Sequence, residues 1–340
     1  MLKIVSINFG LLLVFLAAAE FLFGTWFSTD PLDQLGLPRG TSTIVSAKPL
    51  YPGGDEFVYR RDHWGFRGDH GDPSRITILT VGGSTTNQLY LPEEQTWQQV
   101  LERQFHDNGR ADVVVANAGV DGQSTVGHLQ SLRDWFPHVP GLKPRFVLAY
   151  VGINDTQVSG TWVDTLRHYS LNRIVKQKSA IFRLSRQISG MVVASRARLR
   201  HQAVDYAAAK WTETGAQAVP SGDSNVAQYQ QRLKLMADEI HAMGAVPVFI
   251  TQTRGDFKKA GGKIVGMVTE DGPNGIDQYQ ALMPYNAATR DVCRENGLLC
   301  LDLARDLAFE DGDFYDYLHN SPAGAEKIGR WLYAKLAGLV

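Results

Sequence analysis

The chain has 340 residues, of which 44% are hydrophobic and 20% are charged, so it can build a sizeable core and is neither disordered nor collagen-like. Its 34 basic and 35 acidic residues leave a formal net charge of -1, which creates no global field for nucleic acid and argues against a nucleic-acid partner. Two cysteines, Cys293 and Cys300, are too few for a disulfide-rich scaffold or for a zinc site held by four thiolates.

The first predicted element is an apolar segment from Ile4 to Phe27, whose 24 residues are enough to cross a hydrocarbon core. Lys3 precedes it, whereas Asp30 and Asp33 follow it, so the positive-inside bias predicts a cytoplasmic N-terminus and an exported main body. We expect an uncleaved anchor of a single-pass inner-membrane protein, with the rest of the chain on the periplasmic, extracytoplasmic side. A signal peptide cleaved near residues 17–19 and a buried helix of the domain are the alternatives.

From Arg75 onward, short β-branched runs alternate with longer helical patterns, as in βαβ units. Nearly continuous apolar runs predict five parallel strands, at Ile76–Val81, Asp112–Asn117, Arg145–Val151, Ala245–Thr251 and Leu298–Leu303. Helices are expected at Glu93–His106, Thr125–Trp135, Ala227–Met243, Gln278–Glu295 and Pro322–Leu336, the last one capped by Ser321. The order predicts a doubly wound three-layer α/β/α domain over residues 75–340, with functional residues just after the strands.

Three stretches interrupt this alternation. Residues 29–74 are rich in Pro, Gly and Asp and are interpreted as a linker and lead-in, and residues 252–277 as an irregular loop over the site. Residues 164–224 are expected to form a mainly helical insertion. Between Arg167 and Arg200 this insertion has nine basic residues and no acidic one, which favours either amphipathic helices on anionic lipid or a solvated face packed on the domain.

Polar groups follow the predicted strands in the places that the fold favours. Ser84 lies in a Gly-Gly-Ser turn after the first strand, where its hydroxyl is exposed as a candidate nucleophile. Gly122 follows the second strand and Asn154 the third, and each offers an N–H group to a developing oxyanion. Asp316 and His319 lie after the fifth strand, three positions apart. A serine needs a histidine to accept its proton and a carboxylate to orient that histidine, so this set predicts nucleophilic acyl chemistry.

These blocks resemble the SGNH hydrolase superfamily, the GDSL-type lipases and acylhydrolases, in its membrane-tethered bacterial type. Ser84, Gly122, Asn154 and His319 match the four residues that name the superfamily, and the resemblance spans residues 76–336. It implies a flavodoxin-like sheet, Ser84 as nucleophile, His319 as general base and then acid, and Asp316 as its orienting partner. The backbone N–H groups of Ser84 and Gly122 and the Asn154 side chain would form the oxyanion hole.

Two features lie at the margin of this resemblance. Gly83 stands where the Gly-Asp-Ser block has its aspartate. The lead-in at residues 62–68, Asp-His-Trp-Gly-Phe-Arg-Gly, looks like the segment before the first strand in such members, and the sequence gives it no chemical role.

Weaker candidates each have an ordinary structural reading. Ser124 is a rival hydroxyl but lies where a helix N-cap is expected, and Arg254 could bind substrate or lie at the surface. Cys293 and Cys300 could form a disulfide or remain two buried thiols. The acidic residues and histidines of the lead-in lack the spacing of metal ligands and favour a solvated loop. They are Asp62, His63, Asp69, His70 and Asp72.

The sequence thus predicts an extracytoplasmic, membrane-tethered serine esterase without cofactor or metal. Its expected substrates are small O-acyl groups, acetyl above all, on a small molecule, a carbohydrate or a cell-envelope glycan. The alternatives are an O-acyltransferase with the same triad and a catalytically silent carbohydrate-binding component. A nucleotide-binding domain is disfavoured because the first βα turn has neither Gly-x-Gly-x-x-Gly nor a P-loop lysine. Acyl group, acceptor and oligomeric state stay open.

Overall fold

The computed structural model describes residues 2–158, 178–185, 188–189, 201–216, 223–270 and 272–340. The chain forms two compact units. The smaller consists of Met1–Leu37 and Asp164–Arg200, and the larger of Pro38–Val163 and His201–Val340. The predicted strands and all the predicted site residues belong to the larger unit.

The larger unit is built on a five-stranded parallel sheet, as predicted. Its strands are β3 (Ile78–Gly82), β4 (Val115–Asn117), β5 (Phe146–Tyr150), β7 (Val246–Ile250) and β10 (Leu299–Leu301). They lie in the order β10-β7-β5-β3-β4, and each neighbouring pair is parallel. Every residue of β3 and β5 is buried, which explains the continuous apolar runs in the sequence.

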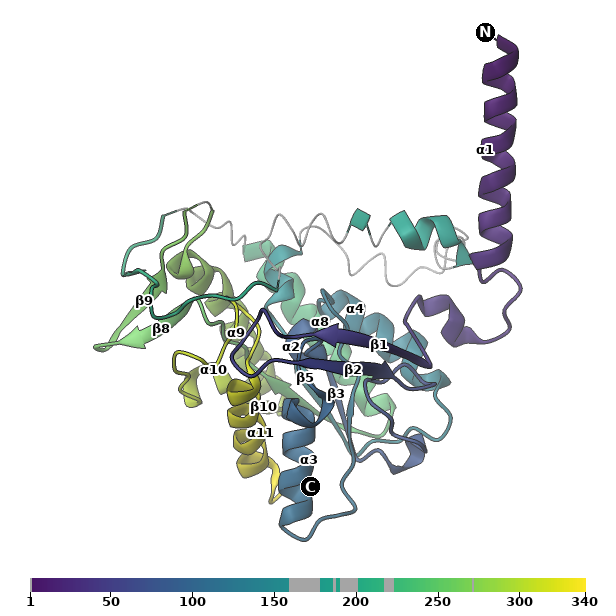
Figure 1. Cartoon of the computed structure of the whole chain (residues 1–340). Helices are drawn as coiled ribbons and strands as arrows, with labels where there is room; N and C mark the ends of the chain where they lie inside the picture. Colours follow the sequence, from purple (N-terminus) through teal and green to yellow (C-terminus); the bar gives the residue numbers. More distant parts are fainter. Residues whose placement is uncertain (1, 159–177, 186–187, 190–200, 217–222, 271) are drawn as a thin grey trace. The chain divides into compact units, whose positions relative to one another are not determined.

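Helices cover the sheet in two groups. One group contains α3 (Trp97–Asp107) and α11 (Pro322–Leu336), which pack against each other and lie side by side in Figure 1. The other group contains α4 (Thr125–Gln130), α8 (Asp223–Ala242) and α9 (Gly275–Asn296). The Ser321 hydroxyl accepts the Gly324 N–H at 3.3 Å, which confirms the predicted cap of α11. The helix predicted to reach Trp135 leaves α geometry after Gln130 and continues as a π-helical turn.

Two hairpins occupy stretches expected to be irregular. The lead-in contains β1 (Thr41–Ser46) paired antiparallel with β2 (Glu56–Arg61). Residues 252–277 contain β8 (Phe257–Ala260) and β9 (Lys263–Met267), joined by the short β6 (Trp211–Thr212) into a second sheet. Both hairpins are only partly buried and contain several charged or hydroxyl side chains, so they lack the long apolar runs by which strands were predicted.

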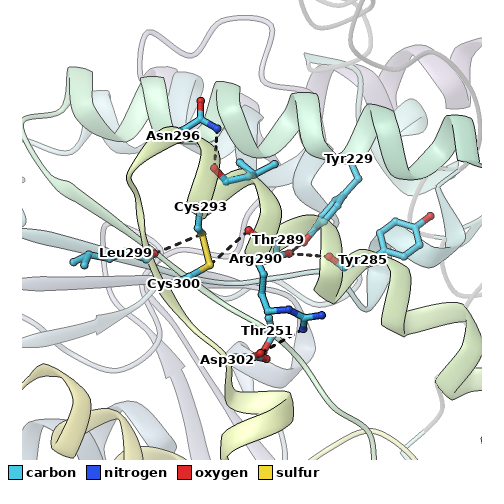
Figure 2. Close-up of a disulfide and its surroundings, with 11 residues drawn as sticks. Tyr229, Thr251, Tyr285, Thr289, Arg290, Cys293, Asn296, Leu299, Cys300 and Asp302 are labelled. Carbon is cyan, nitrogen blue, oxygen red and sulfur yellow. Dashed lines mark hydrogen bonds and ion pairs between the residues drawn. A yellow bond between two sulfur atoms is a disulfide. The ribbon is translucent and has the colours of Figure 1, made fainter.

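A disulfide joins Cys293 near the end of α9 to Cys300 in β10, with 5.9 Å between the two Cα atoms (Figure 2). Gly297 ends α9 in a left-handed conformation, with φ of 64°. This turn brings the chain back onto the edge strand, so a helix end and a strand seven residues later lie close enough to be bridged.

The smaller unit contains α1 (Leu2–Phe23). Its segment Val5–Phe23 has a mean hydropathy of 2.1 and no buried residue, so it is long and apolar enough to span a membrane and differs from a buried core helix. At the end of α1, the Glu20 carboxylate accepts hydrogen bonds from Ser179 and from the N–H groups of Ala180 and Ile181. Most of the predicted basic insertion lies outside the described residues.

Candidate active site

The turn after β3 places Ser84 at the start of the short helix α2 (Ser84–Asn87). A Cβ atom at Gly82 would lie 2.0 Å from Thr86 Oγ1 and 2.8 Å from the Tyr150 carbonyl oxygen, so the strand can turn this tightly only with glycine there. As the first residue of a helix, Ser84 has a backbone N–H without an intrahelical acceptor.

Ser84, His319 and Asp316 form a continuous chain of polar contacts. His319 Nε2 lies 2.8 Å from Ser84 Oγ, and His319 Nδ1 lies 2.7 Å from Asp316 Oδ2. The other carboxylate oxygen of Asp316 accepts the backbone N–H groups of Leu318 and His319 at 2.8 and 2.6 Å. One turn of chain therefore fixes the acid relative to the histidine, as their spacing in the sequence predicts.

The charge state of Asp316 suits this arrangement. Burial alone would raise its pKa, but the attraction of His319 and the hydrogen bonds from Leu318 and His319 outweigh burial and hold the pKa below its usual value. Asp316 is therefore a carboxylate at neutral pH and can stabilise a positive charge on the adjacent imidazole.

Asn154 begins the 3-10 turn η6 (Asn154–Gln157) after β5, and its amide lies beside the serine turn. Its Nδ2 donates to the Gln123 carbonyl at 2.8 Å, and a Cβ at Gly83 would be only 2.3 Å from the same nitrogen. A small hollow is lined by Ser84, Gln123 and Asn154 among others.

Gly122 lies in the loop after β4 with a left-handed φ of 72°. The Val120 N–H donates to the Gly82 carbonyl at 3.0 Å, which brings this loop beside the end of β3. The structure thus gathers all four sequence blocks around the carboxyl ends of β3, β4 and β5, where a doubly wound sheet binds its ligands.

Two side chains from the later part of the insertion at residues 164–224, His201 and Tyr206, also reach the catalytic loop. His201 Nδ1 lies 2.6 Å from the Tyr315 hydroxyl, and its ring centroid is 4.1 Å from that of His319. The Tyr206 hydroxyl donates to the Asp316 carbonyl at 2.7 Å. Burial and the neighbouring His319 lower the pKa of His201 to about 4, so it packs against His319 as a neutral ring. No sequence motif marks either residue.

Gln252 links two of the predicted blocks from the end of β7. Its Oε1 accepts the Ile153 N–H at 2.7 Å, and its Nε2 donates to Thr85 Oγ1 at 3.0 Å. Gln252 therefore holds the segment before Asn154 to the residue after Ser84. The sequence interpretation missed it because a single glutamine after a strand has no distinguishing pattern.

The structure also locates the weaker candidates, and Ser124 among them makes no side-chain capping hydrogen bond. The Arg254 side chain is only 10% exposed and pairs with Asp256 at 2.6 Å, so it is not a surface arginine. Ser124 occupies the N-cap position of α4. Asp62 accepts the N–H groups of Trp64 and Phe66, both at 2.9 Å, and so shapes the lead-in turn.

A model of the GDSL-like lipase/acylhydrolase family matches residues 80–327. The chain belongs to this family. Membership confirms the expected resemblance and makes the protein an ester-hydrolysing enzyme. No curated protein matches the chain by sequence.

Three solved structures are similar to this chain over most of its length. TesA is 17% identical, with 78% of this chain and 99% of that chain covered and a TM-score of 0.45. The acetyl xylan esterase AlAXEase is 14% identical, with 77% and 100% covered and a TM-score of 0.45. Est24, a carbohydrate acetylesterase from Sinorhizobium meliloti, is 10% identical, with 78% and 100% covered and a TM-score of 0.43.

Proposed function

We propose that this GDSL-family enzyme is a membrane-tethered, extracytoplasmic serine esterase that removes small O-acyl groups, acetyl above all, from a carbohydrate or cell-envelope glycan. The observation that carries the proposal is the chain of contacts from Ser84 Oγ through His319 to Asp316, at 2.8 and 2.7 Å. A nucleophile, a base and an orienting carboxylate at hydrogen-bond distance are what acyl transfer through a serine requires.

In this reaction His319 accepts the Ser84 proton while Oγ attacks the ester carbonyl, and a tetrahedral intermediate with a negatively charged oxygen forms. The N–H groups of Ser84 and Gly122 and the Asn154 amide stabilise that oxygen. His319 then protonates the leaving sugar oxygen, so an alcohol departs and the acyl group stays on Ser84. Water, activated by the same histidine, releases the acyl group as a carboxylic acid, and Asp316 remains ionised throughout.

The size and lining of the hollow support a short acyl group. The hollow beside Ser84 is small, with an empty volume of about 230 Å³ that includes space open to solvent. Gln123, Asn154 and Gln252 contribute polar groups to its wall. An acetyl group needs little room, whereas a long fatty chain would have to extend beyond this hollow. The apolar segment Val5–Phe23, with Lys3 before it, supports the envelope location.

The test uses the full-length protein in detergent and short-chain aryl esters. Ser84→Ala is expected to lower kcat by roughly 10⁴–10⁶, because the serine, histidine and aspartate act as one unit. A fluorophosphonate should label the wild type and leave Ser84→Ala unlabelled, and acetyl esters should be cleaved faster than octanoyl esters. Undiminished turnover by Ser84→Ala would refute the proposal, and unlabelled wild type that binds glycan would identify a silent binding component.

A further inference from the structure

The lead-in that precedes the sheet supplies Arg61, a buried cation whose partners lie around the active site. Only 5% of this residue is exposed. Its Nη2 donates to the Gly119 carbonyl at 2.7 Å and to Asn87 Oδ1 at 3.0 Å, and its Nη1 donates to the Gly65 carbonyl at 2.7 Å. These acceptors are all uncharged, and an ion buried in this way contributes little stability over an apolar side chain of similar volume.

Two of these acceptors belong to segments that carry site residues. Asn87 is the last residue of α2, the helix that begins with Ser84. Gly119 lies in the loop after β4, three residues before Gly122. The Arg61 guanidinium therefore makes hydrogen bonds both to α2, which begins with the nucleophile Ser84, and to the loop after β4, which contains the proposed oxyanion donor Gly122.

The Asn87 side chain also connects α2 to the loop after β4. Its Oδ1 accepts from Arg61 and from the Tyr59 hydroxyl, the latter at 2.8 Å. Its Nδ2 donates to Asp121 Oδ1 at 2.8 Å, next to Gly122 in the chain. The connection thus runs from the β2 strand through Asn87 to the residue that precedes Gly122.

The backbones of these two segments are in direct contact. A Cβ atom at Gly119 would lie 2.3 Å from the Asn87 backbone nitrogen, so no side chain separates α2 from the loop. Arg67, also from the lead-in, donates to the carbonyls of Asn87, Gln88 and Leu91 and so holds the far end of α2. The hydrogen bonds of Arg61 are therefore among the contacts that hold the helix and the loop together.

We propose that Arg61 is a positioning residue that sets the Gly122 N–H against Ser84 by tying α2 to the loop after β4. This inference rests on the proposed function, in which both groups stabilise the tetrahedral intermediate. Oxyanion donors act only when they are held where the charge develops, and a displacement of about 1 Å can lower the rate roughly 100-fold. The lead-in at residues 29–74, to which Arg61 belongs, thereby has a chemical role that its sequence does not reveal.

The experiment measures kcat and KM of the full-length enzyme on a short-chain aryl ester, with kcat expressed per site labelled by a fluorophosphonate. Arg61→Met keeps the apolar stem and removes the donors, and it is expected to lower kcat roughly 10–100-fold with KM changed less than about threefold. The kcat of Arg61→Lys should lie between those of the wild type and Arg61→Met, because one ammonium group cannot reach both the Gly119 carbonyl and Asn87 Oδ1. Asn87→Ala should show a similar loss, and the double variant should lose little more than the worse single one.

Arg60→Met is the matched control, since Arg60 lies in the same strand with a side chain 53% exposed and paired with Glu93. It is expected to keep kcat within about twofold. The inference would be overturned if folded Arg61→Met had the wild-type kcat or if only its KM changed. A failure of both Arg61→Met and Asn87→Ala to fold would also overturn it, because Arg61 would then have a structural role. Ser84→Ala in the same series separates the two proposals: if it stays active the proposed function fails, and if it is inactive the arginine result judges this inference alone.

Discussion

Asn154 is the proposed side-chain donor of the oxyanion hole. Its Nδ2 lies beside the serine turn and donates to the Gln123 carbonyl, so its direction is fixed before any substrate arrives. We expect Asn154→Ala to fold normally and to lose roughly 10²–10³ in kcat with little change in KM, because the amide binds the charged intermediate more strongly than the ground-state carbonyl. Steady-state kinetics on a short-chain aryl ester measures both constants.

Asn108→Ala is the control for this change, because Asn108 follows α3 and its exposed side chain bonds only within its own helix end, to the Gln104 carbonyl. Its kinetics should equal those of the wild type. If the loss in Asn154→Ala appeared wholly in KM, Asn154 would be a substrate-binding residue rather than an oxyanion donor.

Residues that follow strands could be located from the sequence, whereas their supporting residues could not. Ser84, Asn154 and the Asp316–His319 pair were recognisable because glycine turns and polar groups interrupt apolar runs at known places in the fold. His201 and Gln252 reach the site from distant segments by side-chain contacts alone. A single histidine or glutamine has no spacing that would indicate such a contact.

At the scale of elements, the short helix α4 contains a buried histidine that makes the fold sensitive to acid. Burial lowers the pKa of His128 to about 3, whereas a histidine in the unfolded chain has a pKa near 6.5. Between these values the unfolded state binds the proton more readily, so stability is present above about pH 6.5 and is lost as the pH falls. From pH 7 to pH 5 this group alone removes about 2 kcal/mol from the free energy of unfolding.

We therefore expect thermal unfolding of the wild type to shift to lower temperature by several degrees between pH 7 and pH 5, and that of His128→Asn to shift less. The variant's absolute Tm is immaterial, since the comparison is between two pH values for each protein. His138→Asn, which changes an exposed histidine, should follow the wild type. If the Tm of His128→Asn fell as much as that of the wild type between pH 7 and pH 5, groups other than His128 would cause the loss of stability.

Elements were predictable where apolar residues dominate their sequences, and this includes the edge strand β10, whose residues are exposed or only partly buried. The five strands of the main sheet form uninterrupted apolar runs, and all five were predicted at their places. The β1–β2 and β8–β9 hairpins carry lysines, arginines and threonines on solvated faces, so their sequences resemble loops. The sequence left the pairing of Cys293 with Cys300 undecided, because only the left-handed turn at Gly297 determines that the two cysteines meet.

At the scale of the whole molecule, the two compact units could not be anticipated. The alternation of strands and helices predicts the α/β domain, because a parallel sheet needs a crossover between successive strands. Nothing in the sequence pairs the N-terminal helix with residues 178–183. Glu20 and Arg183 make that connection through hydrogen bonds to Ser179 and to the Phe23 carbonyl, which are visible only in three dimensions.

The proposed location of the enzyme makes a prediction about topology. With Lys3 on the cytoplasmic side and Val5–Phe23 spanning, protease added to spheroplasts should digest the catalytic domain and leave at most a short N-terminal fragment. Membrane association should survive carbonate and high-salt washing, because a spanning helix does not release as salt screens charge.

A variant that combines Lys3→Glu with added lysines after residue 33 tests whether the charge bias sets the topology. Reversing this bias should lower the fraction of chains with an exported domain. Wild-type protein that resists protease in intact spheroplasts and is digested after lysis would place the domain in the cytoplasm. An envelope glycan could then not be its substrate.

The close approach of Gly83 to Asn154 constrains how this site can change through evolution. An aspartate at position 83, as in the Gly-Asp-Ser block of the family, would bring its Cβ to 2.3 Å from Asn154 Nδ2 and push the amide away from the Gln123 carbonyl. A mutation from Gly-Gly-Ser to Gly-Asp-Ser would therefore require the end of the Asn154 side chain to take another direction. The residue at position 83 and the direction of the Asn154 amide are therefore expected to change together through evolution.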